Sequence, residues 1–365
     1  MGSNQTHREN PEPASTVVDW AVFAPFADRS TAWLQPFVSP PHRLTIMPRS
    51  GEATNWHLNA KPTTSLHEWR HYSQALSLGM KQRKYGIITV FPQMAALAGL
   101  RKRVTGGKWP LVAYFFNTTD YEGWRSALAR YALRAVDVFV VHNRAEIEIY
   151  SKWLAISPDR FVFIPLQKPD LFDSRTPQRS DRLIFATGSG RRDYATLFAA
   201  VDGLDCRVVV APGVHAVRGL SAPPNVEIRF DITKREILEL SQRAQVNVIP
   251  MDTGGPAAGT VTIVEAMRLG AALVVTDRSG VSDYVVDERT ALLTPAGDVE
   301  ALRSSMERLL DDRELRERLG SSAACHAAER FSDEAAGREL SRLLDRFVTG
   351  AGSTTSASAS ASASN

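Results

Sequence analysis

Two stretches in the second half of the chain have the residue types that bind a diphosphate. The first is the loop at 254–259, which follows an apolar run and leads into a helical run ending at Gly270. The second follows another apolar run and contains Gly188, Ser189, Arg191 and Arg192. Glycines let backbone N–H groups approach an anion, a helix N-terminus attracts it, and arginines hydrogen-bond to phosphate oxygens. We therefore predict that these stretches hold a nucleotide diphosphate.

One acidic residue, Glu265, lies one to two turns inside the helical run. Its neighbours Val264, Ala266 and Met267 are apolar, so it is expected to face a cleft, where a carboxylate could accept both hydroxyls of a ribose. Plainer interpretations are a solvated helix-forming Glu and, for 188–193, a strand-to-helix turn with solvated arginines. The third glycine of the dinucleotide fingerprint, its acidic residue and the Walker pattern are missing, which argues against NAD and P-loop sites.

The elements that must position these residues alternate between strand and helix in both halves of the chain. This alternation is typical of parallel sheets with right-handed crossovers, so we predict an α/β fold with two consecutive Rossmann-like domains. A short strand is expected at 284–286. The predicted organisation is a disordered N-terminus at 1–16, an acceptor-side domain at 17–165, a linker at 166–181, a nucleotide-sugar-binding domain at 182–332, a helix at 333–348 that is a candidate to cross back to the first domain, and a disordered tail at 349–365.

Composition excludes several classes of protein. The chain has 365 residues and a formal net charge of only +3, so no global field marks a nucleic-acid binder. The two cysteines, Cys206 and Cys325, have no metal-type spacing, which suits a reducing compartment without disulfides. No apolar run approaches the ~20 residues that span a bilayer. We expect a cytoplasmic protein, with the inner face of the membrane as a candidate location.

The order of residues from 254 to 280 resembles the donor half of nucleotide-sugar glycosyltransferases with the GT-B fold. The residues that carry it are Gly259, Glu265-Ala266-Met267, Gly270, Val274-Val275-Thr276-Asp277 and Gly280. The sequence is most similar to family four, the retaining group. The likeness continues through 192–197, 224–226, 290–298, 309–312 and 329–332, and more loosely through 134–142 and 163–165. It covers most of residues 17–348 and implies two Rossmann-like domains facing across a cleft.

The resemblance also implies roles on the donor side. Glu265 would accept the ribose hydroxyls of a nucleotide-diphosphate sugar, while the backbone of Gly259, Thr260 and Val261 would hold the distal phosphate. Arg192 stands where the family commonly has a lysine and would neutralise the leaving diphosphate, with Arg191 as the alternate. Gly188 and Ser189 complete the expected donor set. Such enzymes need neither a metal ion nor a cofactor, because positive side chains and the helix stabilise the leaving group.

Two departures from the family pattern bear on the reaction. Ala257 stands where the family has a Glu that touches the sugar, and Asn117 replaces a His at the end of an acceptor-domain strand. Arg192 and Asn117 are thus the residues expected at the reacting centre, although Asn117 cannot act as a base. The implied mechanism is front-face substitution with retention, in which a phosphate oxygen takes the acceptor's proton. The alternatives are a GT-B-like protein that binds nucleotide or glycan without transfer, and a nucleotide-sugar epimerase.

Candidates on the acceptor side are Asp28 and Arg29 after the first strand, and His142 at the end of another. The acceptor would be a glycan, a lipid-linked sugar or a small molecule. His142 has a plainer interpretation as the neighbour of a helix N-cap. The segment from Met94 to Lys108 joins an apolar helix to basic residues and could contact an anionic membrane. Its alternative is a core helix followed by a solvated basic loop.

Overall fold

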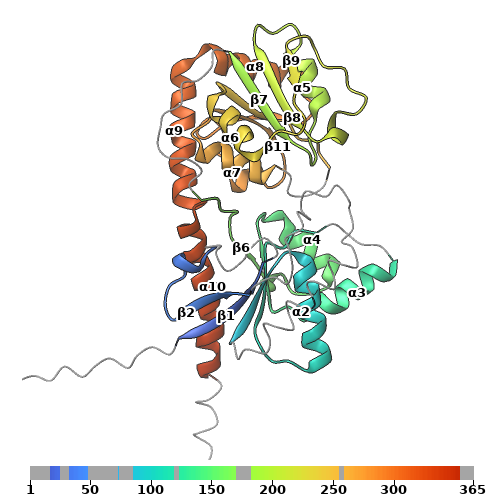
Figure 1. Cartoon of the computed structure of the whole chain (residues 1–365), viewed down its shortest axis with the longest axis vertical. Coiled ribbons are helices and arrows are strands. Elements are labelled where there is room, and N and C mark those ends of the chain that lie inside the picture. Colours follow the sequence, from blue (N-terminus) through green and yellow to red (C-terminus); the bar gives the residue numbers. More distant parts are fainter. Residues whose placement is uncertain are drawn as a thin grey trace, which may run out of the picture.

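The computed structural model describes residues 17–24, 33–47, 73, 85–118, 123–169, 182–254 and 259–353. In this part of the chain, two six-stranded parallel sheets are each covered by helices (Figure 1). The prediction of two α/β domains is confirmed. The predicted acceptor-side residues Asp28 and Arg29, and Ala257, lie outside the described residues, as do the predicted disordered N-terminus at 1–16 and most of the predicted linker.

The N-terminal sheet has the strand order β2-β1-β3-β4-β5-β6. Its strands are β1 (Val18–Phe23), β2 (His42–Ile46), β3 (Gly86–Val90), β4 (Leu111–Tyr114), β5 (Val138–Val141) and β6 (Phe161–Phe163). The helices of this half are α2 (Pro92–Thr105), α3 (Gly123–Leu133) and α4 (Ala145–Leu154), with short 3-10 turns at η1 (Gln35–Phe37) and η3 (Pro158–Arg160). The central strands β3, β4 and β5 bury both faces, which is why they are continuous apolar runs, whereas the edge strand β2 alternates between buried and exposed residues.

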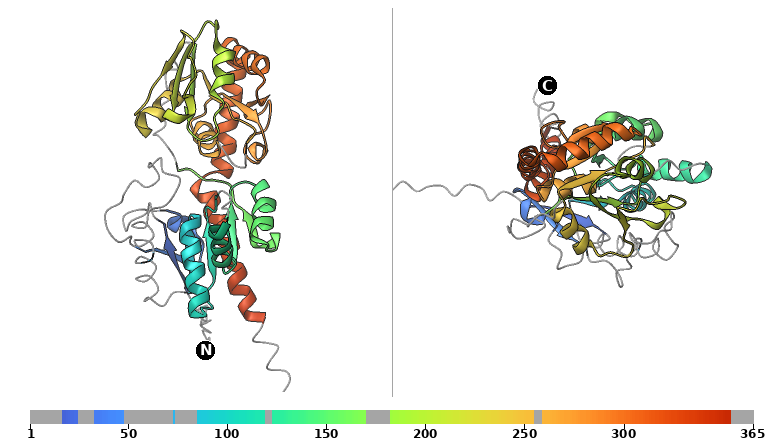
Figure 2. Two further views of the ribbon diagram at one scale, coloured as in Figure 1. Left: turned by 90° about the vertical axis from the view of Figure 1, so that its right-hand side faces the viewer. Right: turned by 90° about the horizontal axis from the view of Figure 1, so that it is seen from above.

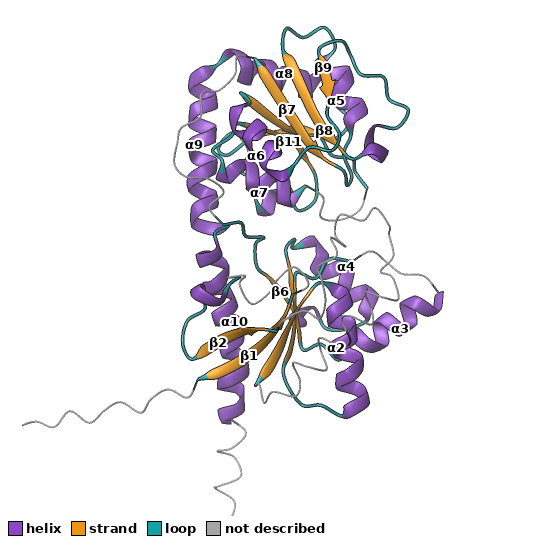
Figure 3. Ribbon diagram, viewed as in Figure 1, coloured by secondary structure: helices purple, strands orange, loops and turns teal. Residues whose placement is uncertain are grey.

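The C-terminal sheet has the order β12-β11-β10-β7-β8-β9. Its strands are β7 (Leu183–Gly188), β8 (Arg207–Pro212), β9 (Val226–Ile228), β10 (Val246–Ile249), β11 (Leu273–Asp277) and β12 (Leu292–Pro295). Helices α5 (Tyr194–Val201) and α8 (Val299–Asp311) share a core with one face of this sheet. The other face packs against α6 (Lys234–Arg243), α7 (Thr260–Arg268) and α9 (Arg313–Arg330) (Figure 3).

The last helix, α10 (Asp333–Ser353), belongs to the core of the N-terminal domain. Its residues Leu340, Leu343 and Leu344 are buried with Trp20 on the face of the first sheet away from α2. Figure 2 shows this helix running from the C-terminal domain down the side of the N-terminal one. The helix continues past the predicted end at 348, so the predicted tail from 349 overlaps its last turn. Adding residues to a formed helix costs little, so small residues can extend it beyond the apolar face.

One local prediction was wrong, and so was part of the alternative interpretation of residues 94–108. Residues 284–286 are not a strand but follow a 3-10 turn, η5 (Val281–Asp283), because Tyr284 is used in contacts between the domains. The basic residues after Leu100 are not in a loop, since α2 continues to Thr105 before Gly106 ends it in the left-handed conformation. Among the described residues, no helix is long and apolar enough to cross a membrane.

Candidate functional site

The two predicted phosphate-binding stretches lie side by side. They follow β7 and β10, which are neighbours in the sheet although β8 and β9 come between them in sequence. Arg192 forms an antiparallel bridge with Met251, and the Asp193 N–H donates to the Pro250 carbonyl at 3.1 Å. This is the point at which strand order reverses, where open parallel sheets bind ligands. The topology therefore brings together two loops that are more than 50 residues apart in the sequence.

Arg192 connects these loops. Its Nε donates to the Thr187 carbonyl at 3.0 Å and its Nη1 to the Gly190 carbonyl at 2.9 Å, while its Nη2 donates to Thr262 Oγ1 of α7 at 3.0 Å. A guanidinium has five N–H donors, so this arrangement leaves two for a ligand. Burial lowers the pKa of Arg192, and the nearby Arg278 guanidinium lowers it further. An anion bound here would offset both effects.

Gly259 begins α7 in a way that only glycine allows easily. Its φ is +85°, and a Cβ would lie 2.5 Å from the Met251 sulfur. Among the described residues no side chain caps this helix, although the first backbone N–H groups of any helix lack acceptors within it. The N–H groups of Thr260 and Val261 are thus available to an anion close to Arg192, and Val261 is 39% exposed.

Two further arginines surround the same loop. A Cβ added to Gly254 would lie 2.2 Å from Arg191 Nη1, and Arg278 Nη2 donates to the Gly254 carbonyl at 3.1 Å. Arg278 follows β11 and was not predicted as a site residue. Burial lowers its pKa, Asp252 raises it and Arg191 lowers it again. Arg278 thus lies close enough to both other guanidiniums for charge repulsion, which a bound phosphate would relieve.

Glu265 is only 6% exposed and is paired with two lysines. Lys168 Nζ, from the segment after β6, lies 3.0 Å from Oε1, and Lys234 Nζ, from the first turn of α6, contacts Oε2. Glu265 is therefore not the solvated Glu of the plainer interpretation. Because carboxylate oxygens can each accept more than one hydrogen bond, the lysine pairs leave acceptor capacity for hydroxyl groups.

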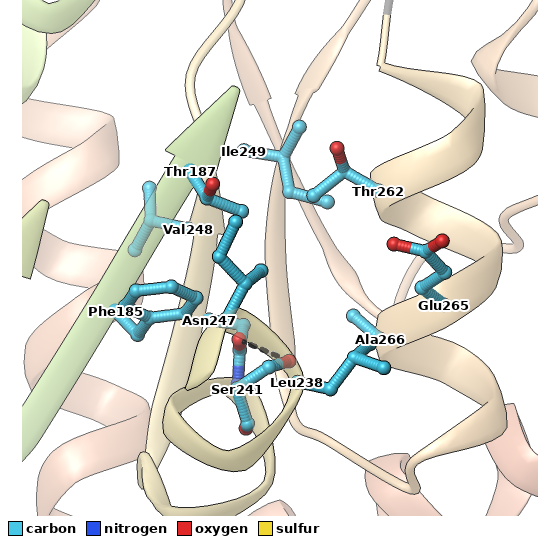
Figure 4. A pocket seen from close by; sticks show the side chains of 11 residues that line it. Phe185, Thr187, Leu238, Ser241, Asn247, Val248, Ile249, Thr262, Glu265 and Ala266 are labelled. Atoms are coloured by element: carbon cyan, nitrogen blue, oxygen red, sulfur yellow. Dashed lines mark hydrogen bonds between the residues drawn. The ribbon is translucent and has the colours of Figure 1, made fainter. Parts of the chain in front are cut away.

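The crevice beside Glu265 is narrow. In Figure 4, Thr262 and Glu265 project from α7 toward residues of β7, β10 and α6, and Ser241 hydrogen-bonds to Asn247. The enclosed volume is about 10 Å³, which holds no more than a water molecule. A nucleotide would therefore lie over this crevice, with Glu265 at its edge, rather than inside it.

On the N-terminal side, His142 ends β5 in an apolar setting. Its Nδ1 donates to the Ile164 carbonyl at 2.6 Å, and its ring lies against Tyr114 and Phe115 at centroid distances of 5.6 and 4.7 Å. Burial lowers its pKa to about 4, so the ring is neutral at pH 7. Nε2 is buried and has no hydrogen-bond partner among the described residues. His142 is thus a buried core histidine with one acceptor nitrogen remaining.

The two domains contact each other through the ends of β5, β6 and β11. Tyr284 donates from its hydroxyl to the His142 carbonyl and accepts from the Leu166 N–H at 2.9 Å. Asp283 accepts from the Arg144 N–H at 2.8 Å, and a Cβ on Gly280 would overlap the Asn143 side chain. The first residues of the predicted linker are therefore packed between the domains, and the carboxyl edges of the two sheets face each other.

Glu146 lies in the first turn of α4 beside this contact. It is 1% exposed, and burial raises its pKa to about 7, more than the hydrogen bonds from the His142 and Asn143 backbone and from Tyr150 lower it. Its carboxyl group therefore titrates near neutral pH.

Asn117 is exposed after β4, and no contact joins it to Arg192 in the described part of the chain. In these described residues, no group of three or more His, Cys, Asp or Glu side chains could hold a metal ion. The four candidate residues at the ends of N-terminal strands are thus one buried histidine, one exposed amide and a pair, Asp28 and Arg29, outside the described residues.

The comparison with protein families concerns the domain that carries Glu265. Residues 216–325 match the model named "Glycosyl transferases group 1". The match covers most of the C-terminal domain, from the residues after β8 to the middle of α9. The group 1 match includes α7 and Arg278 but begins after Arg191 and Arg192.

Two curated relatives align with part of this chain. The chain is 37% identical over 83 residues to an alpha-D-kanosaminyltransferase of Streptomyces kanamyceticus, and 29% identical over 103 residues to the capsular polysaccharide biosynthesis glycosyltransferase CapM of Staphylococcus aureus. These alignments cover 23% and 28% of this chain and span only 22% and 27% of the relatives' length.

Solved structures are similar over nearly the whole chain. Sucrose-phosphate synthase from Thermosynechococcus elongatus has a TM-score of 0.67 at 16% identity, covering 91% of this chain and 100% of that one. HepE from Anabaena, solved in complex with UDP, has a TM-score of 0.63 at 12% identity, covering 90% and 99%. At these identities the likeness shows the fold alone, which is the two-domain GT-B fold.

Sequence reasoning missed Lys168, Lys234 and Arg278. Lys168 stands in a segment without periodicity, and Lys234 is one of several charges at the start of a helix. Only Arg278 had a usable signal, because it directly follows a buried parallel strand whose carboxyl end lies at the ligand-binding edge.

Proposed function

We propose that this protein is a glycosyltransferase that moves a sugar from a nucleotide-diphosphate sugar to a glycan, lipid-linked or small-molecule acceptor, with retention. The observation that carries the proposal is the meeting of two phosphate-type loops where strand order reverses. Arg192 lies between them and hydrogen-bonds to α7, whose uncapped N-terminus starts at Gly259. The match of residues 216–325 to the group 1 family model and the GT-B fold support it.

In this proposal the α7 N–H groups and Arg192 bind the diphosphate, while Arg191 and Arg278 add positive charge around it. Glu265 accepts the ribose hydroxyls, with Lys168 and Lys234 holding its carboxylate in place. The similar HepE structures are complexes with UDP and UDP-glucose, which supports a nucleotide-sugar donor.

The chemistry follows from where charge develops. The acceptor oxygen bonds to the anomeric carbon on the face from which the diphosphate leaves, the bond from that carbon to the phosphate oxygen breaks, and the acceptor's proton passes to a phosphate oxygen. Negative charge grows on the leaving diphosphate, so Arg192 and the helix N-terminus stabilise the transition state more than the ground state. No strongly basic side chain is needed, which is compatible with Asn117 and with a neutral His142. We propose that these groups replace a metal ion in that role.

The experiment is a thermal-shift screen of the full chain with UDP, GDP and ADP and with sugars activated by each. A ligand at 100 times its Kd adds about 2.7 kcal/mol to stability. Glu265→Gln, which keeps the shape of the side chain, should weaken nucleotide binding about tenfold or more, as expected for losing hydrogen bonds to a charged group. Glu227→Gln is the matched control, because Glu227 is also paired with two cations but lies on β9.

A second measurement, release of free sugar from the bound donor, separates transfer chemistry from binding. A thermal shift with slow donor hydrolysis supports the proposal. A shift without hydrolysis or transfer to any acceptor favours the GT-B-like binding protein instead. The absence of a shift with every nucleotide would contradict both.

A further inference from the structure

One helix of the N-terminal domain exposes a stripe of large apolar side chains. Trp124, Leu128 and Tyr131 are 73%, 49% and 51% exposed. They are spaced by four and three residues, so they share one face of α3. Val104, at the end of α2, is 76% exposed. A contiguous apolar surface on a folded domain usually marks a contact with a partner or a membrane.

The apolar residues at the start of α2 do not contribute to this surface. Met94, Ala95 and Ala98 are buried in the core beneath the helix. Only the C-terminal end of α2, which carries Lys102 and Arg103, reaches the cavity described next. Of the membrane contact predicted for residues 94–108, the basic residues and Val104 are on the surface. The other apolar side chains of such a contact would have to come from α3.

A basic cavity of about 440 Å³ lies beside the end of α2. It lies near the amino ends of β5 and β6. The loops after β7 and β10 that carry Arg192 and Gly259, here called the donor loops, face the other edge of this sheet. The lining of the cavity contains four cationic side chains and one carboxylate, which belongs to Asp137: the residues are Lys102, Arg103, Gly106, Gly107, Arg134, Ala135, Asp137 and Arg160. Lys102 pairs with Asp137, so three positive charges remain without a carboxylate in the lining. Burial lowers the pKa of Arg160, the charge of Asp137 raises it, and the charge of Arg103 lowers it.

The cavity and the stripe form one surface. The Arg103 guanidinium, in the cavity lining, lies 4.6 Å from the centroid of the Tyr131 ring on α3. Arg134 lines the cavity directly after α3 ends at Leu133. In Figure 1, α2 and α3 lie next to each other on the side of the domain away from α10. Aromatic and apolar side chains are therefore bordered by cations that an anionic ligand would neutralise.

We propose that this surface docks the protein on an anionic lipid membrane. Trp124, Leu128 and Tyr131 enter the boundary between headgroups and acyl chains, and the cavity binds a phosphate group of a lipid headgroup. Indole and phenol rings suit that boundary, since one end is apolar and the other polar. A second copy of this chain fits less well, because a symmetric pair would bring two cationic cavities together.

The surface lies apart from the donor loops, so the inference goes beyond the transfer reaction and does not depend on it. Helix α3 connects the carboxyl end of β4 to the amino end of β5, so the stripe runs along the side of the domain. A membrane on that side leaves the edge that faces the C-terminal domain open to an acceptor carried by a lipid.

The test is flotation of the full chain with vesicles of phosphatidylcholine alone and with one third phosphatidylglycerol. The wild type should float only with anionic vesicles, and high salt should release it. Arg103→Glu should weaken binding about 30-fold, at about 1 kcal/mol for each of two charge units. Trp124→Ser combined with Leu128→Ser should abolish flotation. Circular dichroism melts check that each variant folds; these side chains are exposed, so unchanged melting is expected.

Two control variants lie in the C-terminal domain. Arg313→Glu reverses an exposed charge and Val214→Ser removes a 65% exposed apolar side chain, and both should float like the wild type. A wild type that does not bind anionic vesicles overturns the inference, as does equal binding to neutral vesicles or binding unaffected by the α3 variant. Stabilisation by inorganic phosphate that depends on Arg103, without vesicle binding, would identify a free-phosphate site instead. A concentration-dependent dimer lost in the α3 variant, again without vesicle binding, would identify a second copy.

Discussion

The two sheet edges that face each other differ in chemistry. On the C-terminal side, Arg191, Arg192 and Arg278 surround a helix N-terminus and Glu265 is held by two lysines. On the N-terminal side, the ends of β3 and β4 carry Phe91 and Phe115, whose rings lie 5.2 Å apart, and His142 is neutral.

Among the described residues, only the C-terminal edge has several charged side chains held in place before a ligand binds. A diphosphate needs cations in fixed positions, and the donor loops supply them. At the opposite edge the positions of the side chains are determined by packing of aromatic rings. Phe91 and Phe115 adopt φ values of +76° and +56° there. Non-glycine residues tolerate such angles only where packing imposes them, at about 1 kcal/mol or more each. In the proposed function, such an aromatic edge would select an acceptor by shape more than by charge.

The strongest test of the charged edge is Arg192→Ala. It should lower turnover by a factor of about 10²–10³, the scale of losing one donor that stabilises developing charge. The measurement is kcat with a nucleotide sugar that shifts the melting temperature. Arg207→Ala is the control, because Arg207 is exposed on β8 and pairs with Glu227. A loss below threefold would remove Arg192 from the reacting centre, and a loss confined to KM would make it a ground-state binding residue.

Glu146→Gln tests whether burial in the N-terminal domain raises the pKa of the Glu146 carboxyl group. The folded pKa of Glu146 is about 7, above the ordinary value of 4.5. Between these values the unfolded chain binds fewer protons than the folded one, so stability of the wild type falls as pH rises. The variant should gain up to about 3 kcal/mol relative to the wild type between pH 5 and pH 8. Urea unfolding at both pH values measures this.

Glu148→Gln is the matched control for Glu146. Glu148 lies on the same helix but is exposed and paired with Lys152, so its substitution should leave the pH dependence of stability nearly unchanged. Parallel curves for wild type and Glu146→Gln would show that Glu146 does not titrate near neutral pH.

The two lysines that pair with Glu265 differ in exposure, so the two ion pairs should differ in how much they stabilise the protein. Lys168 is 27% exposed in its side chain and Lys234 is 57% exposed. Lys168→Met should lower stability by about 1–2 kcal/mol, and Lys234→Met by less than about 1 kcal/mol, because exposed ion pairs contribute little. Urea unfolding at low and moderate salt checks the order. Equal losses would mean that burial does not distinguish the two pairs.

The smallest effect is expected at Asn117. Asn117 is exposed at the aromatic edge, and its amide cannot act as a base. Asn117→Ala should therefore change kcat less than about threefold, within the range of a weak hydrogen bond. A tenfold loss in kcat with unchanged KM would show that the N-terminal edge also acts on the transition state.

Much of the fold was readable from the sequence. Apolar runs separated by helical periods predicted both parallel sheets, since strands buried on both faces are apolar along their whole length. Glycine after a strand and before a helix predicted the donor loop, and Gly259 indeed has a positive φ. The strand predicted at 284–286 failed because Tyr284 is held in contacts between the domains, and an apolar run this short has no period that separates a strand from a buried turn.

The sequence by itself determined the chemistry of the donor loops, because glycines, arginines and an isolated Glu are local features. Only the tertiary structure decided which of these groups meet. Sheet order placed β7 beside β10, and so Arg192 beside α7, while chain packing brought Lys168 and Lys234 to Glu265 from residues 97 and 31 positions away. Hydrogen bonds and ion pairs act over a few ångströms of space, whatever the distance along the chain. For that reason composition and spacing could propose the candidate site, but the residues that contact it became known only from the fold.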